Sequence, residues 1–304
     1  MAGRRHRWFS IRIPGSFEIG IGSGFHRNRH LIITKGIARE ENGGIRLHPD
    51  DMNRFFISSF HIIFLLLPPT LRADALEEII TQVRPGNIVI IGETHQKPES
   101  PLFFKRLVDA AVDKYQCLSI GLEIDRKQQE IIDDLMAGVA PVSTIKVPVV
   151  IDHPGYRQLL EQLAAIKQRA PCVRVEAIDA DRDRDENMAK WLTEFPSDKP
   201  VLALLGGLHT LQKVDWMIKS ARPAVAEILA KRGFRVKSYP QRWPPEECDT
   251  EVQRASNRFV SVSDSDALRI LNESLTSLIN AKPYRSTQGV VDGFVVWECS
   301  ENTS

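Results

Sequence analysis

The sequence is poor in cysteine and in long apolar runs. It has four cysteines in 304 residues, and no two of them have the close spacing of a zinc site or a Cys-x-x-Cys redox motif. Its main apolar stretch, residues 55–67, is shorter than the roughly 20 residues of a membrane-spanning helix. Internal repeats and the Gly-x-Ser-x-Gly turn of serine hydrolases are also absent. These absences argue against a zinc module, an integral membrane protein, a repeat protein and a serine esterase.

Residues 1–51 differ in composition from the rest of the chain. They hold 9 of the 40 Lys and Arg residues, 8 of the 18 Gly and 4 of the 8 His, without a sustained helical or strand period. We therefore expect an unstructured N-terminal extension. If translation begins at Met52, residues 1–51 are not part of the native protein. In that case its Arg-rich start carries no information about nucleic acid binding.

Residues 52–75 have the layout of a secretory signal peptide. A positive charge at Arg54 precedes the apolar stretch, and Ala73-Asp74-Ala75 supplies a small-x-small cleavage pattern. We expect export in a Gram-negative bacterium, cleavage after Ala75 and a periplasmic mature chain, residues 76–304, without a membrane span. No cysteine follows the small residues, so a lipid anchor is not expected. The alternative is a buried core helix over residues 55–67 behind a genuine extension.

The mature chain is slightly acidic. Beyond Ala75 it has 29 basic and 33 acidic residues, which argues against a nucleic acid partner. An oxidising compartment permits disulfides, but the sequence does not choose among the three full pairings of four cysteines. We expect Cys117 and Cys172 to be core residues of two strands.

From Leu76 onward, amphipathic helical segments alternate with short runs of Val, Ile and Leu, a pattern typical of β-α units. The prediction is an α/β fold with a single mature domain, in which a largely parallel central sheet is flanked by helices. Strands are expected at residues 87–91, 117–122, 172–178, 201–205, 235–238, 259–262 and 293–297. Helices are expected at residues 102–114, 127–136, 156–169, 185–194, 211–219, 224–232 and 266–280, with a long loop at 240–257.

Polar residues follow the first four predicted strands. His95 lies four residues past the first strand, Glu123 ends the second and His209 follows the fourth, while Asp179 and Asp181 follow the third. In an open parallel sheet, ligands bind at the carboxyl ends of the strands. We therefore expect one edge of the sheet to collect these side chains.

Two of the three histidines in the mature chain follow a strand in the same pattern, Gly92-Glu93-Thr94-His95 and Gly206-Gly207-Leu208-His209. Glycine permits a tight turn, which places each imidazole at the head of a following helix. The repetition of the motif, with Glu123 between the copies, indicates a functional site. The alternatives are that the histidines make only structural hydrogen bonds and that Glu123 is a structural partner of an arginine.

Together with Arg184-Asp185-x-x-Met188-Ala189, these motifs resemble, in order, the superfamily that joins ChaN-like haem-binding uptake proteins, erythromycin esterases and the TraB/Tiki proteins. The resemblance covers roughly residues 76–216. It implies an α/β fold with both Gly-x-x-His motifs, Glu123 and Arg184 in one pocket. Members include esterases, metal-dependent peptidases and haem-binding lipoproteins, so the resemblance leaves the activity open.

The first functional hypothesis is hydrolysis of an ester or amide bond in a small molecule or peptide. His95 or His209 is then the general base, Glu93 or Glu123 orients or charges it, and Arg184 stabilises negative charge on oxygen. In a metal-dependent variant, His95, Glu123 and His209 hold Mn, Co or Zn, with the attacking water in an open position.

The second hypothesis is a periplasmic protein that binds haem or chelated iron without turnover. Imidazoles or tyrosines would ligate the iron, and an arginine would pair with a propionate. His153 and Tyr156 are candidates, although a turn and a helix start explain Asp152-His153-Pro154-Gly155 more simply. No tyrosine lies inside the motifs, so the haem ligand is not identified. A third class, an interaction module, would not need the polar cluster.

Overall fold

The structure of the chain is a computed structural model that describes residues 8–13, 17–22, 74–218, 221–242, 254–275 and 281–300. It consists of two units, Met1–Thr70 and Leu71–Ser304, which we describe separately. The apolar stretch of the expected signal peptide lies outside the described residues. None of the described helices has the length and apolar character needed to span a membrane.

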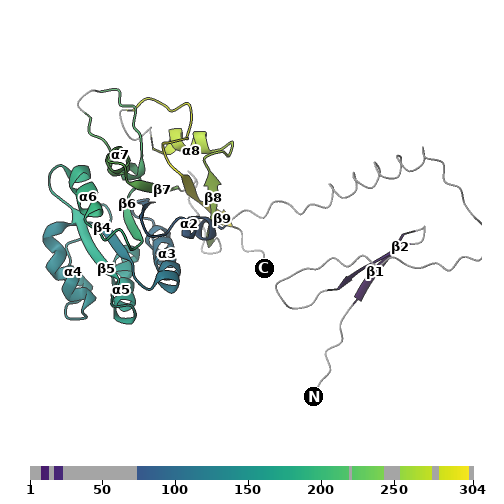
Figure 1. Cartoon of the computed structure of the whole chain (residues 1–304), viewed down its shortest axis with the longest axis horizontal. Helices are drawn as coiled ribbons and strands as arrows, with labels where there is room; N and C mark the ends of the chain where they lie inside the picture. Colours follow the sequence, from purple (N-terminus) through teal and green to yellow (C-terminus); the bar gives the residue numbers. More distant parts are fainter. Residues whose placement is uncertain are drawn as a thin grey trace, which may run out of the picture. The chain divides into compact units, whose positions relative to one another are not determined.

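The first unit contains one antiparallel pair of strands, β1 (Trp8–Ile13) and β2 (Phe17–Gly22) (Figure 1). Trp8 pairs with Gly22 and Ile13 with Phe17. These two strands lie inside residues 1–51, where we expected an unstructured extension. Their sequences alternate apolar with polar or small residues, a two-residue period that is hard to recognise over only six residues.

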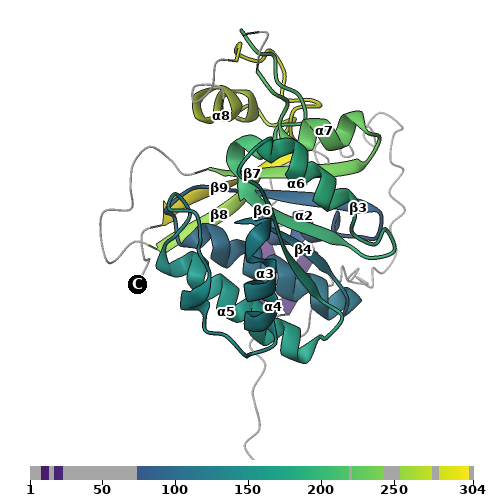
Figure 2. The ribbon, with the colours of Figure 1, turned by 90° about the vertical axis from the view of Figure 1, so that its left-hand side faces the viewer.

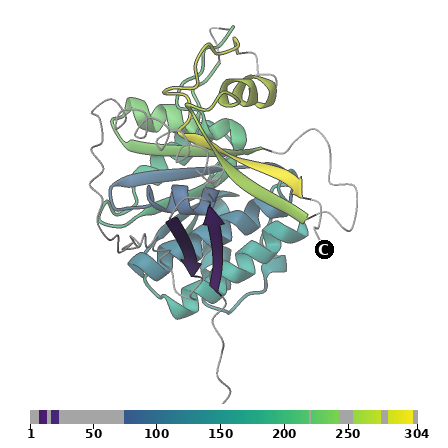
Figure 3. The same cartoon turned by 90° about the vertical axis from the view of Figure 1, so that its right-hand side faces the viewer.

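A seven-stranded sheet forms the centre of the second unit (Figure 1). Its strands are β3 (Asn87–Glu93), β4 (Ser119–Asp125), β5 (Arg174–Asp179), β6 (Val201–Gly206), β7 (Arg235–Arg242), β8 (Arg254–Ser261) and β9 (Gly293–Ser300). They lie in the order β5-β4-β6-β3-β7-β9-β8. All neighbours are parallel except β8, which runs antiparallel to β9 at one edge (Figure 3). All seven predicted strands are present, and the α/β fold is confirmed.

Helices cover both faces of this sheet (Figure 2). Side chains alternate between the faces along each strand, so that Val89 and Ile91 of β3 join one core whereas Ile88 and Ile90 join the other. The first core is covered by α2 (Ala75–Ile80), α3 (Glu99–Tyr115), α4 (Gln129–Met136) and α5 (Pro154–Arg169). The second core is covered by α6 (Arg184–Thr193) and α7 (Val225–Lys231). A third apolar cluster joins α8 (Ala267–Ser274) to β8 and β9.

The connections after β3 and β6 leave the sheet on opposite faces. The chain runs from β3 into α3, which packs in the first core, and from β6 towards α7, which packs in the second. The two strands are adjacent and parallel. In open α/β sheets such a reversal leaves a crevice at the carboxyl ends of the strands, where ligands bind. The topology therefore favours a binding site at the ends of β3 and β6.

The prediction of a helix over residues 211–219 is wrong. Of this stretch, residues 211–218 are described and are not helical. Their backbone pairs with a later segment instead, because Gln212 N–H donates to the Val290 carbonyl and Trp216 forms a bridge with Ala281. Residues 276–280 of the predicted last helix and residues 243–253 of the predicted loop lie outside the described residues.

Cys117 and Cys172 form a disulfide, with 5.0 Å between their Cα atoms. We had expected them to be core strand residues, but both are only half-buried and precede the strands. Each lies two residues before its strand, and the parallel register pairs Ser119 with Arg174. The register therefore brings the two cysteines opposite each other.

Candidate functional site

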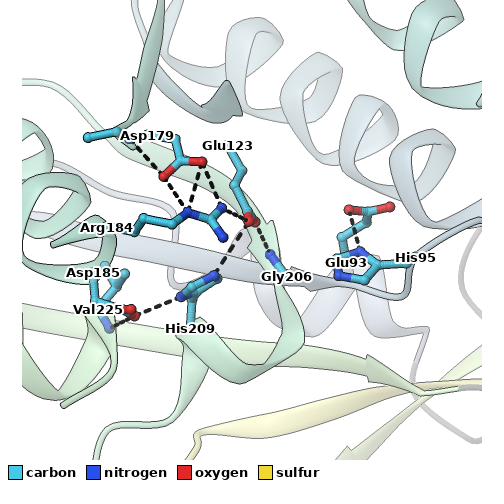
Figure 4. Close-up of polar contacts among 10 residues, drawn as sticks. Glu93, His95, Glu123, Asp179, Arg184, Asp185, Gly206, His209 and Val225 are labelled. Carbon is cyan, nitrogen blue, oxygen red and sulfur yellow. Dashed lines mark hydrogen bonds and ion pairs between the residues drawn. The ribbon is translucent and has the colours of Figure 1, made fainter. Parts of the chain in front are cut away.

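The carboxyl ends of four neighbouring strands carry a cluster of polar residues (Figure 4). Glu93 ends β3, Asp179 ends β5 and Gly206 ends β6, while Glu123 lies near the end of β4. The helix and turn that follow supply Arg184 and Asp185 in the first turn of α6, and His209 in the 3-10 turn η3 (Gly207–Thr210). His209 thus lies in a short turn and not, as we expected, at the head of an α-helix.

Gly206 lies at the centre of this cluster. A Cβ atom on Gly206 would be 3.2 Å from His95 Cε1, 3.4 Å from Glu123 Oε2 and 3.6 Å from His209 Cδ2. Three of the predicted site residues therefore converge on one backbone position. A glycine there leaves their side chains room to approach each other.

Glu123 binds three groups with one buried carboxylate. Its Oε2 accepts the backbone N–H of Gly206 at 2.6 Å, its Oε1 accepts Arg184 Nη2 at 2.7 Å, and His209 Nε2 lies 3.5 Å from Oε1. Burial alone would raise the pKa of Glu123, but His209, the Gly206 N–H and Arg184 together lower it to about 2. The carboxylate is therefore ionised at neutral pH. The arginine pairing that we considered as an alternative is present.

Arg184 is held by two carboxylates. Its Nε donates to Asp179 Oδ1 at 2.9 Å, and its Nη2 donates at 2.7 Å both to Asp179 Oδ2 and to Glu123 Oε1. The hydrogen bonds with Asp179 raise the pKa of Arg184 further above its ordinary value. Among the described residues nothing accepts a hydrogen bond from Nη1, and the side chain is 44% exposed. Asp181, in contrast, pairs with Lys127 outside the cluster.

His209 faces a carboxylate on each side of its ring. Its Nδ1 lies 2.7 Å from Asp185 Oδ1, and its Nε2 faces Glu123 as described above. Burial alone would lower the pKa of His209, but Asp185 and Glu123 raise it to about 10. His209 is therefore an imidazolium at neutral pH and has no free lone pair with which to accept a proton. Asp185 was not among our predicted site residues, although it is adjacent to Arg184 in the motif.

His95 has a different environment from His209. Its Nδ1 lies 3.4 Å from Oε2 of the buried Glu93 carboxylate, and its side chain is 47% exposed. Among the described residues, nothing is hydrogen-bonded to its Nε2. The hydrogen bond with Glu93 raises the pKa of His95 above 6.5, and partial burial opposes the shift. The two Gly-x-x-His motifs therefore present histidines with different carboxylate partners and different exposure to solvent.

His153 is a further histidine of this region. It is the N-cap of α5, so the simpler explanation of its motif is confirmed. Its Nε2 lies 3.7 Å from Glu93 Oε1. Tyr156, one turn further along α5, is fully buried, and burial next to Glu93, Glu123 and Asp179 raises its pKa well above 10. The sequence signal for His153 was its position in a helix-start motif, which gave no indication that it contacts Glu93.

Two site residues are adjacent to strained backbone. Gln96, directly after His95, has φ = 62°, and Asp183, directly before Arg184, has φ = 48°. Residues other than glycine rarely adopt this left-handed region, and such strain persists where the surroundings enforce it. Gln96 is held by its side-chain amide, which donates to the carbonyls of Val149 and Val150. The Gln96 side chain therefore holds the backbone of the turn that follows His95.

The predicted metal ligands do not fit a metal ion as they are placed. In the part of the chain that the structure describes, no three His, Cys, Asp or Glu residues are grouped as a metal site requires. The Glu123 oxygens face Arg184, His209 and the Gly206 N–H, and both ring nitrogens of His209 face carboxylates. Of the two haem-ligand candidates named from the sequence, Tyr156 and His153, both are buried and neither is exposed to a haem iron. A pocket of about 170 Å³ lies beside His209 and is lined in part by Asp185 and Trp216.

No family model and no curated protein matches the sequence. Among solved structures, the chain is similar to ChaN of Campylobacter jejuni, whose structure concerns cofacial haem binding, with 13% identity and a TM-score of 0.41 over 56% of this chain and 87% of ChaN. A Bacillus cereus protein matches with 12% identity and a TM-score of 0.49 over 75% of this chain and 93% of that protein. The type III effector HopBA1 matches with 13% identity and a TM-score of 0.40 over 77% of this chain and 97% of the effector chain. ChaN is thus among the similar structures, as the motifs predicted. Similarity at this low identity does not show that the chain shares the activity of any of these proteins.

Proposed function

We propose that the protein is an exported hydrolase that cleaves an ester or amide bond, with His95 as its general base. The proposal depends on one observation, the Glu93–His95 dyad. A buried carboxylate faces one ring nitrogen of a half-exposed imidazole, and the other nitrogen has no partner among the described residues. A carboxylate in this position orients a histidine and stabilises the imidazolium that forms when it accepts a proton.

The chemistry follows from this dyad and the neighbouring cations. Neutral His95 Nε2 takes a proton from water while the water oxygen bonds to the carbonyl carbon, and the C=O electron pair moves to the carbonyl oxygen. Arg184 Nη1 and the positive charge of His209 stabilise that oxyanion. When the oxyanion collapses, the bond to the leaving oxygen or nitrogen breaks, and the leaving group takes the proton from His95.

Glu123 has a supporting role in this proposal. A carboxylate with a pKa of about 2 is not a proton donor at neutral pH. Its buried charge fixes Arg184 and His209 beside Gly206, so that two cationic groups stay close to the reacting carbonyl. His209 is thus assigned to electrostatic stabilisation and not to base catalysis.

Two observations support export. Residues 52–75 have the layout of a signal peptide, and Cys117 and Cys172 form a disulfide. Disulfides persist in the periplasm and outside the cell, whereas the cytosol keeps thiols reduced. We therefore place the proposed reaction in the periplasm.

The proposal is tested with a panel of nitrophenyl esters and peptide amides. We expect turnover that falls at least roughly 100-fold in His95→Gln, because a general base contributes about 100- to 10,000-fold. Since the base acts in its neutral form, kcat/KM rises with pH through a pKa above 6.5. In Glu93→Gln, the pKa of His95 is no longer raised by the carboxylate, so the rise in kcat/KM moves to lower pH. The plateau value of kcat/KM at high pH also falls.

Asp181→Asn is the matched control, because the Asp181 carboxylate follows β5 closely but pairs with Lys127 outside the cluster. It should keep wild-type activity. Full activity in His95→Gln would contradict the assignment of the base. The absence of turnover on the whole panel, together with a saturable Soret band on addition of hemin, would favour haem binding instead.

A further inference from the structure

A buried histidine lies against Glu93 on the carboxylate oxygen that His95 does not use. His153 Nε2 is 3.7 Å from Glu93 Oε1, and the two side chains are 6% and 2% exposed. Neither atom has a hydrogen-bond partner among the described residues. A buried polar atom without a partner destabilises the folded state, so stability alone does not account for this pair. The mechanism proposed above gives His153 no role.

The surroundings of His153 fix its ring in this position. The ring meets the fully buried ring of Tyr156 edge to face, with 6.4 Å between centroids. The start of α5 also approaches Pro98 closely, since a Cβ on Gly155 would lie 2.9 Å from Pro98 Cα. The loop before His153 is tied to the turn after His95 by the Gln96 side chain. His153 is therefore held next to Glu93 by contacts from several elements.

We propose that His153 is a positioning residue of the site, which holds Glu93 from the side opposite to His95. Glu93 then lies between two imidazoles, with Oε1 facing His153 Nε2 and Oε2 facing His95 Nδ1. This inference rests on the proposed role of His95 as general base. It adds a third histidine, from α5, to a site otherwise built from strand ends and the segments that follow them.

The role follows from how histidine tautomers are set. The hydrogen bond made by one ring nitrogen decides which nitrogen carries the proton. With Oε2 of Glu93 fixed, the proton of neutral His95 stays on Nδ1, and Nε2 keeps the lone pair that accepts a proton from water. Without His153, the Glu93 carboxylate has no opposing group and turns away from Nδ1. His95 then populates both tautomers.

The test is the tautomer of His95 in the full-length chain, read from the ¹⁵N shifts of its ring nitrogens and assigned with His95→Gln. We expect a single Nδ1–H tautomer in the wild type and a mixture in His153→Phe, which keeps a ring against Tyr156 but removes the nitrogen. His153→Gln, whose amide nitrogen extends about as far as Nε2, should restore the single tautomer. In the hydrolysis assay, His153→Phe should lower kcat about tenfold with KM unchanged. This loss is smaller than the roughly 100-fold minimum expected on loss of a general base, because His153 acts only through Glu93.

Asp181→Asn is the control, because Asp181 pairs with Lys127 outside the cluster and does not contact Glu93. It should keep the wild-type tautomer. A single tautomer in His153→Phe, or equal mixtures in His153→Phe and His153→Gln, would overturn the role of His153. If His153→Phe does not fold, His153→Asn replaces it, since its shorter amide does not reach Glu93. The tautomer is measured without substrate, so failure of the hydrolase proposal would be seen separately, as missing turnover.

Discussion

His95 and His209 occupy identical sequence motifs, yet their ring nitrogens have different partners. His209 is enclosed by two carboxylates, whereas His95 has one carboxylate and one nitrogen without a partner among the described residues. A histidine with both nitrogens directed at carboxylates stays protonated and acts as a fixed positive charge. The division of roles between base and cation therefore follows from partners that come from other elements.

Gly206 provides a test of the site that leaves the rest of the fold intact. In Gly206→Ala, the new Cβ meets side-chain atoms of His95 and Glu123 at 3.2 and 3.4 Å. We expect activity to fall at least about tenfold, because small displacements of catalytic groups are costly, while the urea unfolding midpoint changes little. Gly92→Ala is the comparison, since its Cβ would lie 2.7 Å from Pro240 Cα, a backbone atom. That variant should lose about 1–3 kcal/mol of unfolding free energy. Equal losses of stability in both variants would contradict this distinction.

The sequence patterns predicted many residues of the candidate site but not the contacts between their side chains. Short motifs at strand ends predicted that His95, Glu123 and His209 would meet, because parallel strands end at one edge of the sheet. They did not indicate that Asp185 binds His209 or that His153 lies against Glu93. These contacts depend on how the starts of α6 and α5 pack against the strand ends, which a local motif does not encode.

At the scale of elements, the period of apolar residues predicted every strand of the large sheet. β3 and β6 are buried along their whole length and have nearly continuous apolar sequences. The edge strand β8 is only partly buried, and its first half lies in the predicted loop over residues 240–257. The pattern failed where tertiary pairing overrides a local period, as in the segment that pairs with Val290 and Ala281. It also missed α2, whose start coincides with the end of the expected signal peptide.

The disulfide makes a prediction about the two strands that it joins. Cys117 and Cys172 are 55 residues apart and link the starts of β4 and β5. A loop of this length corresponds to a stabilisation of about 4 kcal/mol in the chain-entropy account, with engineered and natural cases often lower. We expect Cys117→Ser to lower the unfolding free energy by about 2–4 kcal/mol, measured in urea without reductant. Adding reductant to the wild type should reproduce the loss, and no effect of either change would show that the bond does not form.

The start of α2 makes a second prediction at this scale. Asp74 caps the helix, since its side chain accepts the Leu76 N–H at 3.0 Å, and Ala75 is fully buried. Cleavage after Ala75 would remove both residues from the mature protein. In uncleaved protein, Asp74→Ala should lower the unfolding free energy by about 1 kcal/mol. In protein purified from the periplasm, an N-terminus at Leu76 would support the expected cleavage site, and one at Asp74 would show that the cap is retained.

At the scale of the whole molecule, the cluster predicts how stability depends on pH. The folded-state pKa of Glu123 is about 2, below the ordinary glutamate value of 4.5, so its contribution is present above pH 4.5 and is lost as the pH falls towards 2. The folded-state pKa of His209 is about 10, above 6.5, so its contribution is present below pH 6.5 and is lost as the pH rises towards 10. Stability from this cluster is therefore greatest between pH 4.5 and 6.5.

This pH dependence is checked by urea unfolding at about pH 3, 5.5 and 9. We expect the wild type to be most stable at the middle value. Glu123→Gln should flatten the acid side of the profile, and His209→Gln should flatten the alkaline side. A profile that keeps its shape in both variants would show that other groups control it.

The central claim is that the protein turns over a substrate through His95. Its most direct test is the initial rate of ester or amide hydrolysis by the wild type and by His95→Gln, each measured with and without hemin. We predict saturable wild-type turnover that hemin does not change and that falls at least roughly 100-fold in the variant. The claim would be contradicted by wild-type protein without turnover whose Soret band saturates with hemin, and by a variant as active as the wild type.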